Sequence, residues 1–291
     1  MLDVTRLTVL VAVARHGSVT AAARALHYAQ PSVSHHLARL EAETGSRLVQ
    51  RVGRGIRLTD AGRLLADRAE EILGRLAAAE AELATHTGLL AGRVRLAAFP
   101  SALSTLVPAA AAGFAAAHPG VDLRFTEAEP PEAVRLLRGG EVEVALVFAH
   151  PDEASPDLDG LRHEPLLTDG TNLVTPPDWT GDRLADHRDR PWIGGCERCR
   201  ARLVTACAAE GFVPDVRFTT DDYVAVQALV AAGMGATTLP GLALAAHRHP
   251  GVRVVPLPGA GRVVSVALLG EPPDPPGTTA LVAHLRAAAR S

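Results

Sequence analysis

The sequence contains no lysine, so all of its 29 Lys and Arg side chains are arginine. Ala, Arg, Gly and Pro are abundant, which is typical of GC-rich coding DNA, so a choice of Arg over Lys indicates no function by itself. Cysteine occurs only three times, between residues 196 and 207. So few cysteines exclude a disulfide-stabilised scaffold.

Three common catalytic motifs are also absent. The sequence has no Gly-x-Ser-x-Gly, no phosphate-binding loop and no His-Glu-x-x-His. Its 12 histidines are scattered without metal-ligand spacing, and helix capping accounts for the adjacent carboxylates Asp221 and Asp222. We therefore expect no enzyme activity, no catalytic residue, no cofactor and no metal site.

No long hydrophobic run predicts a membrane span. The apolar stretch Val224–Leu239 is interrupted by Gln227, Gly233, Gly235 and Thr237. Asp3 and Arg6 interrupt the first apolar stretch, and no small-residue cleavage site follows it, which excludes a secretory signal. We expect a cytoplasmic protein without membrane contact.

The composition is that of a globular protein, with 47% hydrophobic and 21% charged residues, and 291 residues suffice for two or three domains. The net charge of −3 is unevenly spread. Residues 1–58 hold eight arginines and three acidic residues, a net charge of about +5, which leaves about −8 for the remainder. A basic module on an acidic body is typical of a DNA-binding head.

The stretch from Ser18 to Glu43 has the pattern of two short helices and a tight turn. Ser18 is a favourable N-cap for a helix over residues 21–26. Pro31 has the fixed φ suited to the start of a helix over residues 31–43. Two such helices in this order predict a helix-turn-helix.

The second of these helices has two distinct faces. Val33, Leu37 and Leu40 form one stripe, which predicts the buried side. The opposite side and its flanks carry small and hydrogen-bonding residues: Pro31, Ser32, Ser34, His35, Ala38, Arg39 and Ala42. Such a surface suits a DNA major groove, and the alternative is an ordinary solvated helix face.

The segments that follow favour the DNA-binding interpretation. Residues 47–58 alternate in places and turn at Gly53-Arg54-Gly55, which predicts a β-hairpin whose tip presents Arg54 to the DNA backbone or minor groove. Thr59 then caps a long helix to about residue 87. Its apolar residues recur every seven positions, at Leu58, Leu65, Ile72 and Ala79 and at Leu76, Leu83 and Leu90. Such a seam needs a partner, either the chain's own body or, as we prefer, a second copy.

From residue 92 onward, strands and helices alternate, which predicts parallel α/β sheets. Strands are expected over residues 94–99, 121–127, 142–148, 172–175, 192–194, 216–218, 236–239, 252–255 and 263–269. Helices are expected over residues 103–117, 132–137, 197–210, 222–232, 242–247 and 278–290.

Residues 1–90 resemble the N-terminal region of LysR-type transcriptional regulators. The matched positions are Gly17 to Ala23, Leu26, Gln30 to Ser34, Leu40, Glu41, Gly45, Leu48, Arg51 and Leu58 to Gly62. His35 stands where the family commonly has Arg, and Val19 and Val49 stand where it usually has Phe. The C-terminal body is similar to the effector domain of the same family, whose two α/β lobes are similar to type 2 periplasmic binding proteins.

The resemblance implies an α/β protein with an N-terminal all-α winged helix-turn-helix. Its parts are a DNA-binding domain, a linker helix with hinge, and an effector domain of two lobes: residues 1–58, 59–90 and 91–291, with lobe I at about 91–164 and 266–291 and lobe II at about 165–265. It implies binding of double-stranded DNA and a small-molecule effector by a homodimer or homotetramer. The residues expected to contact DNA are Gln30, Pro31, Ser32, Ser34, His35, Arg39, Arg51 and Arg54.

The effector is expected beyond the carboxyl ends of strands, where helix N-termini supply free N–H groups. Three strand-to-helix junctions fit this description and supply the candidate contacts: Ser101, Ala102, Cys196, Arg198, Cys199, Thr219 and Thr220. The alternative for each is a helix cap without a ligand role.

The Cys196-x-x-Cys199 pair allows further interpretations. A structural zinc needs four ligands, and no fourth Cys or spaced His pair lies near Cys207. A thiol at a helix N-terminus beside Arg198 and Arg200 would have a lowered pKa and could sense oxidants. A thiol-based redox-sensing regulator is therefore one alternative, and packing or ligand lining by neutral thiols is another. A solute-binding or enzymatic α/β domain tethered to DNA is a further alternative.

Overall fold

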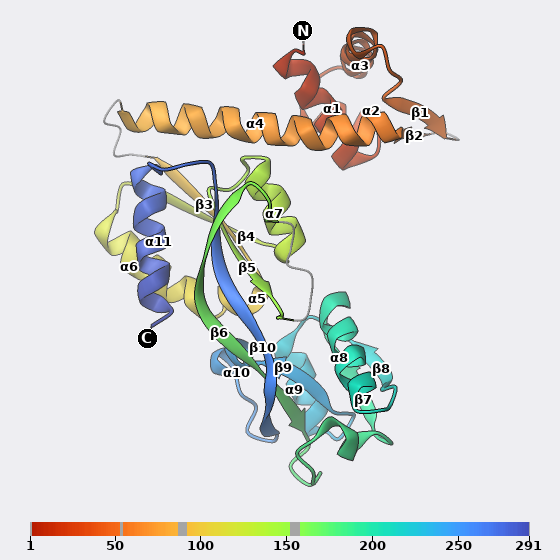
Figure 1. The fold of residues 1–291 in the computed structure, drawn as a ribbon, viewed down its shortest axis with the longest axis vertical. Helices are drawn as coiled ribbons and strands as arrows, with labels where there is room; N and C mark the ends of the chain where they lie inside the picture. The colour runs from red at the N-terminus through yellow and green to blue at the C-terminus, as the bar shows by residue number, and fades with distance from the viewer. Residues whose placement is uncertain (1, 53–54, 87–91, 152–157, 291) are drawn as a thin grey trace.

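The N-terminal part of the chain forms three helices, a hairpin and one long helix (Figure 1). The structure, a computed structural model, describes residues 2–52, 55–86, 92–151 and 158–290. Its first elements are α1 (Val4–His16), α2 (Val19–Ala25), α3 (Gln30–Thr44), β1 (Val49–Val52), β2 (Gly55–Leu58) and α4 (Asp60–His86). We call residues 2–58 the head and α4 the linker helix.

The helix caps predicted at Ser18 and Thr59 are confirmed, whereas α2 and α3 begin two residues and one residue before their predicted starts. Ser18 is the N-cap of α2, and its hydroxyl accepts a hydrogen bond from the Ala21 N–H at 3.0 Å. The Thr59 hydroxyl accepts one from the Gly62 N–H at the start of α4, also at 3.0 Å. Pro31 lies in the first turn of α3, where its missing N–H leaves no hydrogen bond unmade.

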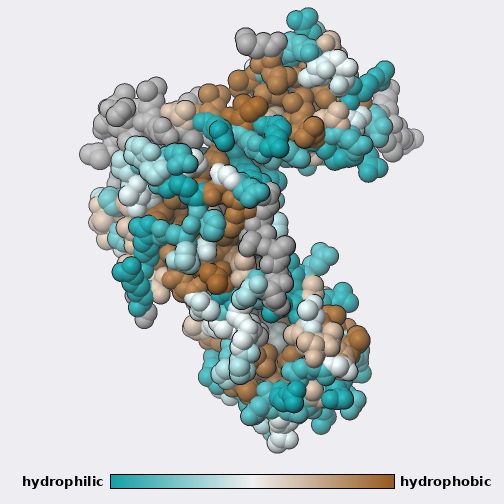
Figure 2. All heavy atoms as spheres, viewed as in Figure 1, coloured by the Kyte–Doolittle hydropathy of each residue, from teal (hydrophilic) through white to brown (hydrophobic). Residues whose placement is uncertain are grey.

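The predicted apolar seam of α4 has two different surroundings. Leu65 and the buried Ala69 pack into the core of the head, chiefly against α1. Ile72 and Leu76, one and two turns further on, lie beyond the head with 42% and 43% of their surface exposed. Hydrophobic atoms are visible along this part of α4 in Figure 2. Leu83 and Leu90 lie outside the residues whose side chains the structure describes.

The remaining elements build two lobes joined by two long strands. Lobe I contains β3 (Arg93–Ala98), α5 (Pro100–Leu103), α6 (Leu106–Ala117), β4 (Asp122–Glu127), α7 (Pro130–Arg138), β5 (Val144–Ala149) and α11 (Pro276–Ala288). Lobe II contains η1 (Leu184–His187), β7 (Pro191–Gly194), α8 (Glu197–Ala209), β8 (Asp215–Thr219), α9 (Tyr223–Ala231), β9 (Thr237–Pro240) and α10 (Gly241–Ala246). The long strands β6 (Leu161–Thr175) and β10 (Arg253–Leu269) run through both lobes.

The main sheet has the strand order β4-β3-β5-β10-β6-β9. Strands β3, β4 and β5 are parallel, as predicted, but β10 pairs antiparallel with both β5 and β6. The prediction of two separate strands over residues 252–255 and 263–269 was wrong, because β10 continues through both. A register shift between Pro256 and Gly261 accommodates the residues between them.

Candidate functional site

The outward face of α3 is the first candidate site. All of its predicted DNA-contact residues are exposed, namely Gln30, Pro31, Ser32, Ser34, His35 and Arg39. Val33, Leu37 and Leu40 are buried on the opposite side, as the periodicity predicts. The Gln30 side-chain amide donates a hydrogen bond to the Ser34 hydroxyl at 3.3 Å, which orders two adjacent polar groups on the exposed face.

The hairpin lies beside this helix. Strands β1 and β2 pair antiparallel, with Arg51 opposite Ile56. Glu41 on α3 accepts hydrogen bonds from the backbone N–H groups of Leu48 and Val49 at 2.8 and 3.2 Å, so the carboxylate holds the start of the hairpin against the helix. Arg54 lies outside the described residues, as does the side chain of Arg51.

The second candidate site lies where the two lobes meet. A cavity enclosing about 470 Å³ of space, part of it open to solvent, is lined by Phe148, His150, Thr171, Arg198, Cys199, Arg202, Thr238, Pro240 and Arg262. Phe148 belongs to lobe I, Arg198 to lobe II and Arg262 to the shared strand β10. We call this space the cleft; its lining comes from both lobes and from the strands that join them.

Arg262 is the most strongly constrained side chain of the cleft. Its guanidinium donates to the Asp169 carboxylate from Nε and Nη2 at 2.9 and 2.8 Å, and to the Ser101 hydroxyl at 2.7 Å. It also lies over the rings of Phe99 and Phe148, 4.7 and 4.2 Å from their centroids. Both members of the ion pair are buried, so each depends on the other for compensation of its charge.

The structure brings together only part of the predicted effector contacts. Arg198 and Cys199 line the cleft. Ser101 is buried and hydrogen-bonded to Arg262, and Ala102 is buried in the core beside it. Thr220 accepts a hydrogen bond from the Asp222 N–H, which is a turn interaction, and Thr219 is exposed on β8.

Several cleft residues gave no recognisable signal in the sequence. Arg262 and Asp169 lie just outside the predicted strands 263–269 and 172–175, in parts of β10 and β6 that the sequence did not indicate, and they are separated by 93 residues. In the sequence, nothing distinguishes Phe148 and Thr171 from other strand residues, and only the packing of the two lobes places both in the cleft lining. An arginine in an otherwise apolar strand, as at Arg262 before Val263 and Val264, is the one signal that could have indicated a buried ion pair.

Cys196 and Cys199 lie at the start of α8, with their Sγ atoms 3.1 Å apart. Cys196 is the N-cap residue, and its sulfur accepts a hydrogen bond from the Cys199 N–H. Hydrogen bonding from the Cys199 thiol lowers the pKa of Cys196 to about 7, against the opposing effect of burial. The pKa of Cys199 is correspondingly raised, because its proton is held by Cys196 and its thiol is buried.

Glu129 and Tyr223 complete the polar surroundings. Burial raises the pKa of the Glu129 carboxyl, and the charges of Arg198 and Arg262 partly oppose the shift. Burial likewise raises the pKa of the Tyr223 phenol. Among the described residues, Glu129 Oε2 is buried without a hydrogen-bond partner. No group of three or more metal-ligating side chains occurs within the described ranges.

Family models match nearly the whole chain. Residues 4–63 match the bacterial regulatory helix-turn-helix protein of the lysR family, and residues 87–290 match the LysR substrate binding domain. Within the ranges the structure describes, no helix has the length and apolarity needed to cross a membrane.

Among curated proteins, the chain is 35% identical to the HTH-type transcriptional regulator CfxR of Cupriavidus necator over 176 residues. The matched segment covers 60% of this chain and 54% of that regulator. It is 29% identical to TfdS of Cupriavidus pinatubonensis over 275 residues, 90% of each chain. Two solved structures share the fold. CbnR has a TM-score of 0.62 at 22% identity and full coverage of both chains, and OxyR from Pseudomonas aeruginosa has a TM-score of 0.66 at 21% identity, covering 100% and 95%.

Proposed function

The chain belongs to the LysR family of transcriptional regulators, and on this premise we propose which of its residues bind DNA and which bind the effector. Regulators of this family bind DNA through an N-terminal helix-turn-helix and a small molecule through the C-terminal lobes, and this chain does both. We assign residues 1–58, which include the head, to DNA, residues 59–90 to dimerisation, and residues 91–291 to the effector. We also propose a cytoplasmic location, because a protein that binds chromosomal DNA must reach it.

The exposed polar face of α3 supports the assignment of the DNA site. Gln30, Ser34 and His35 can read base edges in the major groove, while Arg39 can neutralise a phosphate. The basic charge of residues 1–58 favours this surface for DNA over the acidic remainder. Twofold pairing of linker helices would present two heads to a palindrome-like pair of half-sites.

The direct test is DNA binding to the region flanking the protein's own gene, measured by gel shift. Ser34→Ala should lose sequence specificity, and Arg54→Ala should weaken binding and reduce its salt dependence. Ser104→Ala, an exposed serine in lobe I, is the matched control and should bind like wild type. Absence of specific binding at every salt concentration, even with cell extract as an effector source, would contradict the proposal.

The effector site is proposed in the cleft, around Arg198, Cys199 and Arg262, with Ser101 positioning Arg262. A ligand that contacts Phe148 of lobe I and Arg198 of lobe II would alter the angle between the lobes. That change would alter the spacing of the heads in a dimer or tetramer. An effector that binds without changing the DNase footprint would contradict this mechanism.

A second candidate function, a thiol-based switch, is favoured by the 3.1 Å Sγ–Sγ distance. A hydroperoxide would oxidise the Cys196 thiolate to a sulfenic acid, releasing the corresponding alcohol or water. Attack by Cys199 on the sulfenic sulfur would then form the disulfide and release water. Serine at both Cys196 and Cys199 should abolish a peroxide effect on DNA binding; an unchanged peroxide effect would eliminate this candidate.

A further inference from the structure

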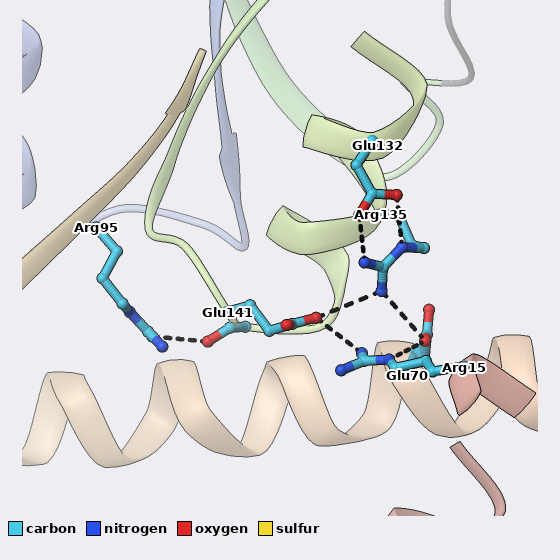
Figure 3. Close-up of polar contacts among 7 residues, drawn as sticks. Arg15, Glu70, Arg95, Glu132, Arg135 and Glu141 are labelled. Carbon is cyan, nitrogen blue, oxygen red and sulfur yellow. Dashed lines mark hydrogen bonds and ion pairs between the residues drawn. The ribbon is translucent and has the colours of Figure 1, made fainter. Parts of the chain in front are cut away.

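The head rests on lobe I through shared ion pairs (Figure 3). Arg15 of α1 binds the carboxylates of Glu70 in α4 and Glu141 of lobe I, at 3.0 and 2.9 Å. Arg135 of α7 approaches the same two carboxylates at 3.7 and 3.4 Å and also binds Glu132. Two arginines, one from the head and one from lobe I, therefore share two carboxylates. Hydrophilic side chains gather along this junction in Figure 2.

The backbones of α4 and α7 also approach each other closely. A Cβ built on Gly74 of α4 would lie 1.8 Å from the carbonyl oxygen of Arg138, the last residue of α7. Only glycine fits this position, because a backbone carbonyl cannot move aside as a flexible side chain could. We call this region of contact the α4–α7 junction. One side consists of Arg15, Glu70 and Gly74, and the other of Arg135, the Arg138 carbonyl and Glu141.

The opposite end of α7 lies near the cleft. Ala128, the residue before Glu129, donates its backbone N–H to the Ala98 carbonyl at 3.0 Å, and the ring of the next residue, Phe99, lies against the Arg262 guanidinium. Glu129 is the N-cap residue of α7, and its Oε2 is buried and accepts no hydrogen bond from the described residues. The Glu129 carboxyl interacts electrostatically with Arg198 and Arg262, both of which line the cleft, and with the Cys196 thiol. An unsatisfied buried acceptor is costly, so a donor supplied by a bound molecule would be favoured at this position.

The body of α7 is suited to move as a unit. It is nine residues long, about 14 Å at the usual rise per residue, and begins with Pro130 and Pro131. Ala133, Val134 and Leu137 are buried in one apolar cluster of lobe I. A helix packed in this way transmits a displacement of one end to the other rather than absorbing it.

We propose that α7 couples the cleft to the DNA-binding head, with Glu129 as the residue through which a bound molecule acts and the α4–α7 junction as its output. The inference rests on the proposed effector function of the cleft and adds to it a chemical requirement. The effector carries a hydroxyl or amino group that donates to Glu129. Because binding coupling is reciprocal, a perturbation of the junction also alters the cleft.

The test perturbs the junction and measures the cleft without DNA or effector. Gly74→Ala separates α7 from α4, and Arg135→Gln removes the ion pairs that Arg135 makes with Glu70 and Glu141. The rate of Cys196 alkylation by iodoacetamide at pH 7, followed by peptide mass spectrometry, should differ from wild type by at least twofold in both variants. Arg286→Gln is the matched control, since it breaks the exposed ion pair with Glu164 on lobe I, and should leave the rate unchanged.

Hydrogen exchange gives the reciprocal measurement. Glu129→Gln should change amide exchange in residues 66–76 of α4, and the change should be absent when Arg135→Gln is also present. Wild-type alkylation rates in both Gly74→Ala and Arg135→Gln would overturn the inference. So would exchange in α4 that does not respond to Glu129→Gln.

A further alkylation measurement, made with DNA present, distinguishes failure of this inference from failure of the proposed function. A duplex bound by the wild-type head should change the Cys196 alkylation rate, and Arg135→Gln should reduce that change. If the protein bound no DNA, the proposed function would fail, whereas the DNA-free comparison of Gly74→Ala with wild type would still decide whether α7 couples the two regions.

Discussion

Arg262 and Asp169 face each other directly across β10 and β6, and their side chains form a buried ion pair with Nη2–Oδ2 at 2.8 Å. The pair lies where the two lobes share their strands. Arg262 also donates to Ser101 in lobe I, while Asp169 accepts the Leu242 N–H in α10 of lobe II. One ion pair therefore holds both lobes against the crossing strands beside the cleft.

Removal of Asp169 should be strongly destabilising, because it leaves the Arg262 charge buried without compensation. We expect Asp169→Ala to lower the free energy of unfolding by about 3–5 kcal/mol. Urea unfolding can be followed by the fluorescence of Trp179 and Trp192, both in lobe II. Asp215→Ala, which breaks an exposed pair with Arg217, should cost less than about 1 kcal/mol. Equal losses in the two variants would contradict the role of the buried pair.

Cys196 should react as a thiolate near neutral pH. Because its pKa is about 7, the rate of alkylation by iodoacetamide should rise between pH 6 and 8, as the reactive thiolate replaces the thiol. Cys199→Ala removes the thiol that stabilises this thiolate, so the midpoint should move to higher pH and the rate at pH 7 should fall about tenfold or more. Cys207 provides an internal comparison, since burial raises its pKa to about 12. A midpoint unchanged by Cys199→Ala would exclude this explanation.

The exposed half of the linker-helix seam should mediate dimerisation. Ile72→Glu places a charge among apolar residues that need a partner, so the variant should sediment as a monomer at concentrations where wild type is dimeric. Leu64→Glu makes the same change on the same helix, about 80° around the axis from Ile72, and should remain dimeric. A dimeric Ile72→Glu protein would place the interface elsewhere.

Arg39 should contribute to DNA affinity through a phosphate rather than a base. Arg39→Ala should weaken binding to all sequences alike and reduce the slope of log affinity against log salt by about 1. Fluorescence anisotropy between about 50 and 200 mM salt would measure the slope. Arg248→Ala, an exposed arginine of lobe II, should leave it unchanged. Loss of affinity at one sequence only would instead indicate a base contact.

The head could be predicted from the sequence because its information is local. Eight residues, from Val33 to Leu40, place three apolar side chains on one stripe of α3, and Ser18 and Thr59 mark helix starts by their own hydrogen bonds. The cleft could be predicted only in outline. The expectation that ligands bind where a strand ends and a helix begins predicted effector contacts at Arg198 and Cys199, which do line the cleft. It also predicted one at Thr219, which is exposed on β8.

The sequence by itself therefore determined the helix faces, the caps, the basic head and the order of α/β elements, because these depend on residues within one or two turns of each other. The tertiary structure decided which side chains meet in the cleft and at the α4–α7 junction. Ser101 and Arg262 are 161 positions apart, and the register of β6 and β10 brings Asp169 to the same point. A pair so distant in sequence leaves no periodic pattern, since its members share neither a helix face nor a turn.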